Sequence, residues 1–447
     1  MCFNGKNAVV IGAKKSGIAA AKLLKKKGYT PFVTEINDSV EIKENVQELE
    51  KLNIDYETGF HTIDKFCEAD FVVLSPGVQI ENFKNMMPEN IPILSEIELA
   101  FRFLKHKFIA ITGSNGKTTT TALTAHILNS AGIKSKAVGN IGDPLSNYAD
   151  FDGTLVVEIS SFQLEHIEKF KPFTAVILNM TPDHLDRYES LDDYYASKAR
   201  IFENMDEGDN LIYNADCSKT SIYIRSANCR KLTFSVQSDK TNAFLKDEHI
   251  FIKGHDGSLK IISKNEISIL GIHNIYNSMA ALVSGLTVGG KIRELAEGLK
   301  DFPGIPHRLE YLGIANGVKY YNDSKSTNVD SLKFALLSFN TPVTLIAGGK
   351  DKMVDVTVLN PLIKYKVKNL VLIGQAAERF KKEFELYAGI VHMASSMEDA
   401  VFASKRMAMA GEVVLLSPAC SSFDMYNNFE ERGDDFRNLV KKICFHQ

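Results

Sequence analysis

Apolar runs, glycine turns and helical segments alternate along most of the chain. Residues 7–12 form an apolar run that ends in Gly12, residues 16–27 carry apolar side chains at helical spacing, and residues 31–34 resume the apolar pattern. A strand, a helix and a second strand in this order are typical of a unit with two parallel strands. The pattern therefore predicts an α/β protein.

Two further segments repeat the pattern. Residues 108–111, 155–159 and 175–179 are nearly all apolar, which is typical of central parallel strands covered on both faces. Residues 209–264 contain short runs in which apolar and polar side chains alternate, separated by turns. This pattern predicts a smaller antiparallel sheet. Residues 301–306 contain two prolines and a glycine and predict a hinge before a third α/β segment. We expect three domains, with the limits 1–96, 97–302 and 303–447.

The composition is that of an ordinary globular protein. The chain has 447 residues, of which 45% are hydrophobic and 24% charged, and its formal net charge is −3. This balance gives no reason to expect nucleic-acid or membrane-surface binding, and no apolar run approaches the roughly 18 residues of a membrane helix. The six cysteines are scattered without a CxxC pair, and the N-terminus does not resemble a signal peptide. We therefore expect reduced thiols and a cytoplasmic location.

The strongest local signal is a glycine-rich turn between an apolar strand and a helix, Thr112-Gly-Ser-Asn-Gly-Lys-Thr-Thr119. Glycines allow backbone N–H groups to surround a phosphate, and the helix N-terminus favours negative charge. Lys117 would reach the β- and γ-phosphates, and Thr118 would bind magnesium. The spacing from Gly113 to Gly116 is two residues tighter than in the usual loop. The motif predicts nucleotide binding but does not identify a reaction.

Polar residues also follow the next two apolar strands. Glu158 ends one of them, and a carboxylate there is costly unless a cation such as magnesium accompanies it. The alternative is a carboxylate that caps the next helix. The motif 179–186, which contains His184, follows the other strand. Because ligand groups gather at the carboxyl ends of parallel strands, Lys117, Glu158 and His184 are expected to converge. The local sequence around Lys198, taken in isolation, is typical of a solvated surface lysine.

The first turn of the chain, from Gly12 to Gly17, resembles a dinucleotide-binding fingerprint without its middle glycine. Lys14 occupies that position, which disfavours NAD binding, and Glu35 stands where an acid would bind a ribose. A nucleoside diphosphate bound in another way and a plain turn without a ligand both stay open.

Three strand ends in the third segment carry polar clusters, at residues 322–328, 347–351 and 417–424. Each cluster alone is more often a set of helix caps. Together they predict the rim of a site, on a domain that closes over a substrate held elsewhere.

The combined motifs resemble those of the Mur ligases and their folylpolyglutamate synthetase relatives. They are Thr112–Thr119, Asn179–Asp186, Gly271–Asn274 with Asn277, Pro306–Glu310 and Asn322–Lys325, and they span nearly the whole chain in the family's order. The resemblance implies an N-terminal Rossmann-like domain that binds a UDP-linked substrate, a central P-loop ATPase, and a C-terminal Rossmann-like domain. The C-terminal motif 417–436 is similar to that of members that add D-glutamate.

The resemblance also implies residue roles. Lys117, His184 and Lys198 would be catalytic, and ATP would be bound by Gly113, Ser114, Asn115, Gly116, Lys117, Thr118, Thr119, Asn274, Arg308 and Asp323. Thr118 and Glu158 would hold one Mg²⁺, while His184 and Lys198, the latter carbamylated, would serve a second. The UDP substrate would contact Lys15, Ser16, Glu35, Gly77 and Asn140, and the amino acid would contact Thr327, Lys350, Ser422, Phe423 and Phe429.

The activity implied by the resemblance is the ATP-dependent addition of D-glutamate to UDP-N-acetylmuramoyl-L-alanine through an acyl phosphate, by a monomer, in cytoplasmic peptidoglycan precursor synthesis. Lys15, Ile36 and Asn37 depart from the uracil-binding residues of many relatives. The alternatives are a folylpolyglutamate-type ligase, another ligase of the same pathway, a nucleotide-gated regulatory protein and a Rossmann dehydrogenase. The full N-terminal segment argues against the first of these, and the C-terminal motif argues against the second.

Overall fold

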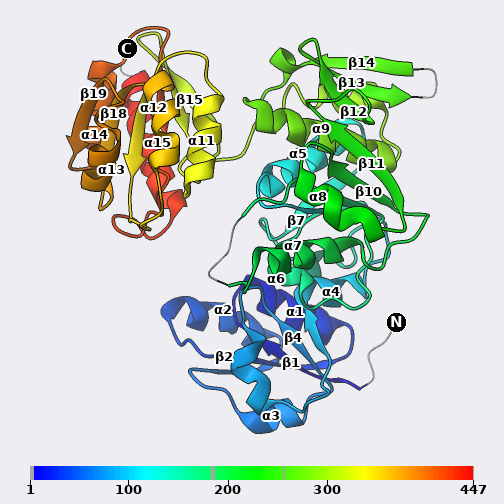
Figure 1. The fold of residues 1–447 in the computed structure, drawn as a ribbon. Coiled ribbons are helices and arrows are strands. Elements are labelled where there is room, and N and C mark those ends of the chain that lie inside the picture. Colours follow the sequence, from blue (N-terminus) through cyan, green and yellow to red (C-terminus); the bar gives the residue numbers. More distant parts are fainter. Residues whose placement is uncertain (1–4, 183–186, 255–256, 446–447) are drawn as a thin grey trace. The chain divides into compact units, whose positions relative to one another are not determined.

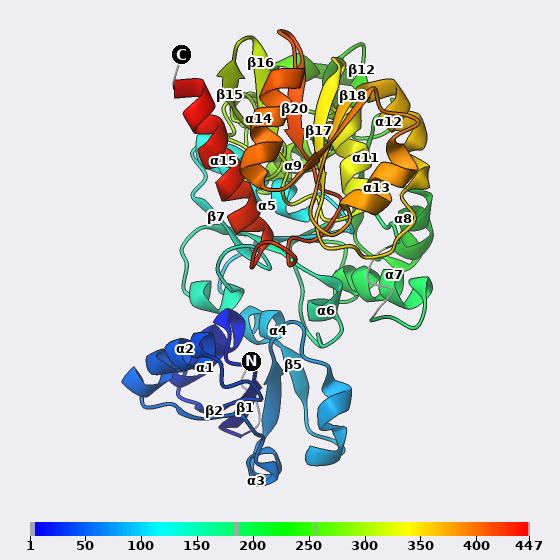
Figure 2. The same ribbon diagram turned by 90° about the vertical axis from the view of Figure 1, so that its left-hand side faces the viewer.

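The computed structural model describes residues 5–182, 187–254 and 257–445 (Figures 1 and 2). It contains three sheets, of five, nine and six strands, with helices between most of the strands. The chain divides into two compact units, residues up to 266 with 276–302, and residues 267–275 with 303 onward. The predicted α/β class is confirmed. Among the described residues, none of the helices has the length and apolar character that a membrane span requires.

The N-terminal sheet is entirely parallel, in the order β3-β2-β1-β4-β5. Its strands are β1 (Asn7–Ile11), β2 (Thr30–Glu35), β3 (Asp55–Thr58), β4 (Phe71–Leu74) and β5 (Ile93–Ser95), and its helices are α1 (Lys15–Lys26), α2 (Val40–Lys51), α3 (Ile63–Cys67) and the 3₁₀ helix η1 (Ile80–Met86). One face packs on α1 and α2, and the other on α3 and η1. Because the strand order reverses between β1 and β4, a ligand site is expected at their carboxyl ends.

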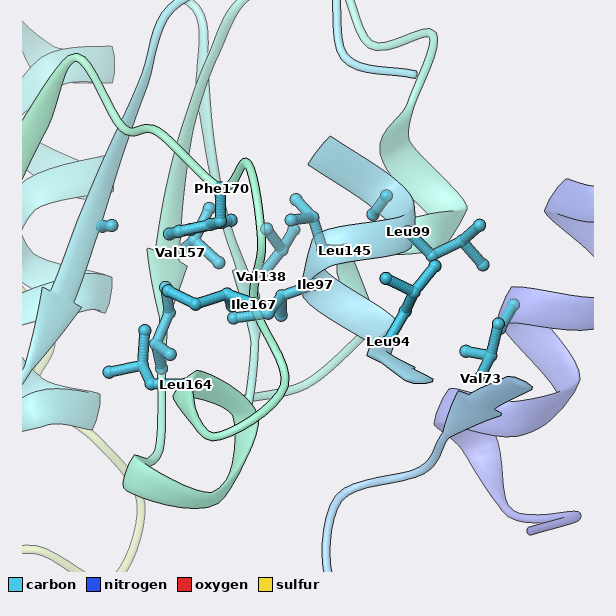
Figure 3. Close-up of a cluster of buried hydrophobic side chains, with 14 of the residues drawn as sticks. Val73, Leu94, Ile97, Leu99, Val138, Leu145, Val157, Leu164, Ile167 and Phe170 are labelled. Atoms are coloured by element: carbon cyan, nitrogen blue, oxygen red, sulfur yellow. The ribbon is translucent and has the colours of Figure 1, made fainter. Parts of the chain in front are cut away.

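Helix α4 (Glu96–Phe101) links this sheet to the central one. Leu94, Ile97 and Leu99 form part of a cluster that includes Val73 of the first sheet and Phe170 beside the second (Figure 3). The buried Glu98 carboxylate accepts hydrogen bonds from the backbone N–H groups of residues 168–170 and from Arg102. A continuous apolar core and a satisfied buried carboxylate therefore join the two sheets into one unit.

The central sheet has the strand order β14-β13-β12-β11-β10-β9-β6-β8-β7. Its strands are β6 (Phe108–Thr112), β7 (Ser135–Gly139), β8 (Thr154–Glu158), β9 (Thr174–Ile177), β10 (Asn210–Asn214), β11 (Arg230–Ser235), β12 (Ala243–Lys246), β13 (His249–Gly254) and β14 (Gly257–Ser263). Its helices are α5 (Lys117–Ser130), η2 (Leu145–Tyr148), α6 (Ser161–Leu164), α7 (Leu191–Ala199), η3 (Arg200–Phe202), α8 (Ser218–Tyr223), η4 (Ile224–Ser226), η5 (Lys264–Glu266), α9 (Ile272–Thr287) and α10 (Ile292–Glu297).

The smaller antiparallel region expected within residues 209–264 is a continuation of the central sheet. Strands β10 and β11 pair in parallel with the sheet, and antiparallel pairing is confined to β12, β13 and β14. The predicted buried strands β6, β8 and β9 lie side by side in the parallel part. Their carboxyl ends therefore share one edge, at which the motif residues follow.

The second unit contains a six-stranded sheet in the order β15-β16-β20-β17-β18-β19, antiparallel only between β15 and β16. Its strands are β15 (Glu310–Ala315), β16 (Val318–Asn322), β17 (Val343–Gly348), β18 (Val367–Ile373), β19 (Ile390–Ala394) and β20 (Val413–Leu416), and its helices are α11 (Val329–Leu337), η6 (Thr357–Leu359), α12 (Asn360–Lys366), α13 (Ala377–Phe384), α14 (Met397–Met407) and α15 (Phe429–Phe445). Apolar clusters cover both faces of the sheet. The boundary after Phe302 falls in the proline-containing stretch that predicted a hinge.

Candidate active site

The glycine-rich loop lies between β6 and α5, as the sequence predicts. Gly113 has a φ of +153° and Gly116, the N-cap of α5, a φ of +86°. A Cβ atom at Gly116 would lie 2.6 Å from Oδ1 of Asn277. The loop therefore needs a glycine at position 116 both for its left-handed backbone and for its close approach to a neighbouring side chain.

The end of β9 fixes the shape of this loop. The Asn179 side chain accepts a hydrogen bond from the Asn115 N–H (2.8 Å) and donates one to the Asn115 carbonyl (2.9 Å). The Ser114 hydroxyl donates to the Thr181 carbonyl (2.7 Å) and accepts from the Thr181 N–H (3.0 Å). The residues after β9 therefore hold the loop in place.

Lys117, in the first turn of α5, points back over the loop. Its Nζ atom donates to the carbonyl oxygens of Gly113 (2.8 Å) and Ser114 (3.0 Å). Thr118 and Thr119 follow it and are buried. A cation, a positive-φ turn and a helix N-terminus at one place are the elements of a phosphate site.

Glu158 ends β8 and is 3% exposed. Its Oε1 accepts a hydrogen bond from the Asn140 side chain (2.9 Å), whereas Oε2 has no partner in the part of the chain that the structure describes. The capping alternative fails, because Ser160 and Gln163 cap the following helix α6. A buried carboxylate oxygen that lacks a donor fits a hard cation such as Mg²⁺.

Lys198 on α7 is 1% exposed, so its interpretation as a solvated surface lysine is wrong. Its Nζ atom donates to the Gly113 carbonyl (3.2 Å) and lies 4.5 Å from the centre of the Tyr194 ring. The Tyr194 hydroxyl in turn donates to the Ser114 hydroxyl (3.2 Å). The sequence reasoning missed Tyr194, which lies one helical turn before Lys198. The predicted His184 lies outside the described residues.

Four of the five predicted UDP residues lie at the carboxyl edge of the N-terminal sheet, whereas Asn140 follows β7 of the central sheet. Lys15 and Ser16 begin α1, and Gly77 follows β4 with a φ of +94°. The buried Glu35 carboxylate accepts hydrogen bonds from the N–H groups of Ala13 (3.0 Å) and Asn37 (3.0 Å). Glu35 therefore closes the first turn, and its role toward a ribose stays a prediction.

Asp323, which follows β16, is buried in the second unit. It accepts hydrogen bonds from the Ser417 hydroxyl (2.8 Å) and the Leu309 N–H (3.2 Å). Burial raises its pKa to about 7, although these hydrogen bonds and the Arg308 charge oppose the shift. The loss of hydration therefore outweighs the polar contacts of this carboxyl, and a polar ligand beside it would change its pKa. Asn274, also predicted for ATP, donates to the Leu270 carbonyl (2.7 Å).

Residues predicted to hold the amino acid lie on loops at the carboxyl edge of the C-terminal sheet. The Lys350 N–H donates to the Ser421 carbonyl (2.9 Å), which joins the loop after β17 to the loop after β20. Lys352, which the sequence reasoning missed, donates from Nζ to the Thr327 carbonyl (3.2 Å). The predicted residues Ser422, Phe423 and Phe429 follow on the loop after β20 and at the start of α15.

Arg432 is a third residue, after Tyr194 and Lys352, to which the sequence motifs assigned no role. The residue is 3% exposed, and its guanidinium donates to the Ser324 hydroxyl (3.0 Å), the Ser324 carbonyl (2.8 Å) and the Cys420 carbonyl (3.1 Å). Burial lowers its pKa to about 10. Arg432 therefore joins the loops after β16 and β20 from the start of α15, and only the tertiary structure shows this contact.

Three family models match the chain. The Mur ligase MurD-like N-terminal domain matches residues 6–94, the Mur ligase middle domain residues 111–285, and the Mur ligase glutamate ligase domain residues 307–420. The UDP-N-acetylmuramoylalanine--D-glutamate ligase of Geotalea uraniireducens is 40% identical over 98% of both chains. The enzyme of that name from Koribacter versatilis is 40% identical over 99% of both chains.

Solved structures share the fold at low sequence identity. A pseudomurein peptide ligase type C from Methanothermus fervidus is 18% identical, with a TM-score of 0.61 over 98% of this chain and 100% of its own. A MurF ligase from Thermotoga maritima in complex with ADP is 14% identical, with a TM-score of 0.62 over 93% of this chain and 95% of its own.

The fold and the three matched models define a peptide-forming ligase architecture, and the chain belongs to the Mur ligase family. Within that family it groups with the UDP-N-acetylmuramoylalanine--D-glutamate ligases, which it matches along nearly its full length.

We predict that Gly116→Ala lowers the affinity for ATP at least tenfold, because a Cβ atom 2.6 Å from the Asn277 side chain would displace the loop. Gly132→Ala is the matched control, since Gly132 also has a positive φ (+75°) but a Cβ there meets open space within the described residues. Both variants should lose about 1–2 kcal/mol of unfolding free energy from backbone strain. Calorimetric binding of a non-hydrolysable ATP analogue tests this, and equal affinity in both variants would contradict the prediction.

The raised pKa of Asp323 predicts that the stability of the fold depends on pH. The folded protein keeps the Asp323 proton up to about pH 7, whereas the unfolded chain releases it near pH 4. The folded state therefore binds more protons in this range, so this residue's contribution to stability falls as the pH rises from about 4 to 7, by roughly 4 kcal/mol at most.

Asp323→Asn removes the charge and keeps both contacts, because the amide oxygen accepts from the Leu309 N–H and the amide NH₂ donates to the Ser417 hydroxyl. Its free energy of unfolding should therefore exceed that of the wild type at pH 8, with a gap that shrinks toward pH 5. Urea unfolding at several pH values measures this gap. The exposed Asp64→Asn is the control. A gap that does not change with pH would refute the assignment.

Proposed function

We propose that the chain joins D-glutamate to UDP-N-acetylmuramoyl-L-alanine with the conversion of ATP to ADP and phosphate. The observation that carries this proposal is the site around the phosphate loop, where Lys117, the half-satisfied Glu158 and the buried Lys198 lie at one edge of the central sheet. The full-length similarity to ligases of that name supports the choice of substrates. The ADP in the related MurF ligase supports the use of ATP.

The reaction needs an activated carboxyl group, because a carboxylate does not react with an amine in neutral water. The L-alanine carboxylate of the substrate attacks the γ-phosphate of ATP, forming an acyl phosphate and releasing ADP. Lys117 neutralises charge on the transferred phosphoryl group, and the N–H groups of the loop and of the α5 N-terminus orient it. The D-glutamate amine then attacks the acyl carbon, the amide bond forms, phosphate leaves, and the amine loses a proton.

Thr118 and Glu158 would hold one Mg²⁺, since both offer oxygen ligands and one Glu158 oxygen has no hydrogen-bond partner among the described residues. His184 and Lys198 would serve a second. When bound, these ions supply charge stabilisation for phosphoryl transfer. A carbamate forms when neutral Lys198 takes up CO₂ and releases a proton, which converts a buried cation into an oxygen ligand.

The remaining predicted roles divide among three domains. Residues 1–96 bind the UDP substrate through Lys15, Ser16, Glu35 and Gly77, and residues 97–302 bind ATP and contribute Asn140. Residues 303–447 bind D-glutamate. This domain closes over the acyl phosphate and so keeps water away from it. The amino-acid residues are Thr327, Lys350, Ser422, Phe423 and Phe429, and the contact of Lys352 with Thr327 adds Lys352 to them. We place the reaction in the cytoplasm and expect a monomer.

The first test is phosphate release from ATP with Mg²⁺ and UDP-N-acetylmuramoyl-L-alanine, with D-glutamate, L-glutamate, L-lysine or meso-diaminopimelate added in turn. Release that depends on D-glutamate is expected. Release with another amino acid would keep the ligase reaction but change the substrate. Slow release that needs none of them would favour the nucleotide-gated regulatory protein.

Lys198→Ala should lose most of the activity, and added bicarbonate should raise that of the wild type, because the carbamate needs dissolved CO₂. A short carboxylate such as acetate should restore part of the activity of Lys198→Ala by supplying the missing oxygen ligand. Lys171→Ala, at a partly exposed lysine of the same unit, is the control. It should keep the wild-type activity, respond to bicarbonate as the wild type does, and gain nothing from acetate. An active Lys198→Ala variant that ignores short carboxylates would refute the carbamate.

A further inference from the structure

A polar network at the carboxyl ends of β2 and β3 has no role in the proposed reaction. The Thr34 hydroxyl of β2 lies 2.7 Å from Oε1 of Glu57 on β3 and 2.6 Å from Nδ1 of His61, which follows β3. Glu57 also accepts hydrogen bonds from the Thr62 N–H (2.8 Å) and the Thr62 hydroxyl (2.6 Å). Thr34 is fully buried, so its hydroxyl makes these contacts away from water.

Counting donors fixes the protonation of the His61 ring. Burial opposes ionisation of Glu57, but hydrogen bonds from Thr62 and Thr34 outweigh it and hold the Glu57 pKa below its usual range. The carboxylate is thus an acceptor, and the single Thr34 hydroxyl proton goes to it. Nδ1 of His61 must then carry a proton and donate to the Thr34 oxygen. Burial lowers the His61 pKa, although Glu57 and Glu35 oppose this. The ring is therefore neutral, and Nε2 presents a lone pair.

The ring is also held in orientation. It packs edge-on against Phe83 of η1, with the ring centres 4.9 Å apart, and against Phe66 of α3 at 6.5 Å. Among the residues that the structure describes, Nε2 has no hydrogen-bond partner. A hydrogen-bond acceptor with a fixed orientation at the ligand-binding edge of a sheet can select a ligand that carries a donor at the matching position.

The strand order indicates which part of the ligand reaches His61. In the proposed function, the pyrophosphate lies at the first turn and Gly77, after β1 and β4, and the ribose lies at Glu35, at the end of β2. The sheet continues from β1 through β2 to β3, so a base attached to that ribose extends toward the end of β3, where His61 lies.

We propose that Nε2 of His61 accepts a hydrogen bond from the N3–H group of the uracil base, and that Thr34 fixes the tautomer required. The inference rests on the proposed function, since it concerns the same UDP substrate. Uracil carries a donor at N3, whereas cytosine carries an acceptor there. An acceptor facing cytosine would leave two lone pairs opposed, so His61 would select uridine over cytidine diphosphates. This assigns base recognition to a residue outside the altered positions Ile36 and Asn37.

The test is calorimetric binding of UDP, CDP and 3-methyl-UDP to the full chain. The wild type should bind UDP about 100-fold more tightly than CDP or 3-methyl-UDP. His61→Phe keeps the aromatic packing on Phe83 and removes the acceptor, so UDP should bind about tenfold more weakly and the preference should largely disappear. His106→Phe, at an exposed histidine, is the matched control and should keep the preference.

The tautomer is tested at Thr34. Thr34→Val removes the oxygen that accepts from Nδ1 and should reduce the preference for UDP over CDP, whereas Thr34→Ser should keep it. Thermal unfolding of each variant identifies loss of fold separately. A preference that survives in both His61→Phe and Thr34→Val, or a wild type that binds UDP and CDP equally, would overturn the inference while D-glutamate-dependent phosphate release still stands. A wild type that binds none of the three diphosphates would instead remove the UDP site itself.

Discussion

The shared edge of parallel strands is the constraint on which the site depends. β6, β8 and β9 run in one direction, so the phosphate loop, Glu158 and Asn179 all emerge at the same edge. Asn179 then acts toward the loop as a neighbouring strand would, since its amide both accepts from and donates to the Asn115 backbone. Without this register, Gly113 and Gly116 would be a flexible turn, and Lys117 would have no fixed position over it.

Buried charged side chains lie at the candidate sites of the central domain and of the second unit. Lys198 and Glu158 are almost wholly buried in the central domain, as are Asp323 and Arg432 in the second unit. Burial of such groups costs free energy that hydrogen bonds only partly offset, as the raised pKa of Asp323 shows. In the proposed function, ligands that bring charge and oxygen atoms interact with these groups.

The linker helix α4 explains why the N-terminal and central sheets behave as one unit. Glu98 joins the linker to residues 168–170, and the apolar cluster of Figure 3 runs from Val73 to Phe170. The second unit follows a proline-containing stretch and has its own apolar core on both faces of its sheet. In the proposed reaction, the UDP and ATP sites both belong to the first unit.

The sequence by itself determined the α/β class, the positions of the central strands and the glycine loop that precedes Lys117. These features follow from periodicity and turn chemistry within one stretch of chain, where backbone geometry fixes the spacing of side chains. It did not determine that Lys198 is buried, that Ser160 rather than Glu158 caps α6, or that the antiparallel strands extend the central sheet. Tyr194, Lys352, Arg432 and the tautomer of His61 also emerged only from the tertiary structure. Each depends on contacts between segments far apart in the chain, and packing, not local spacing, decides which of those segments meet.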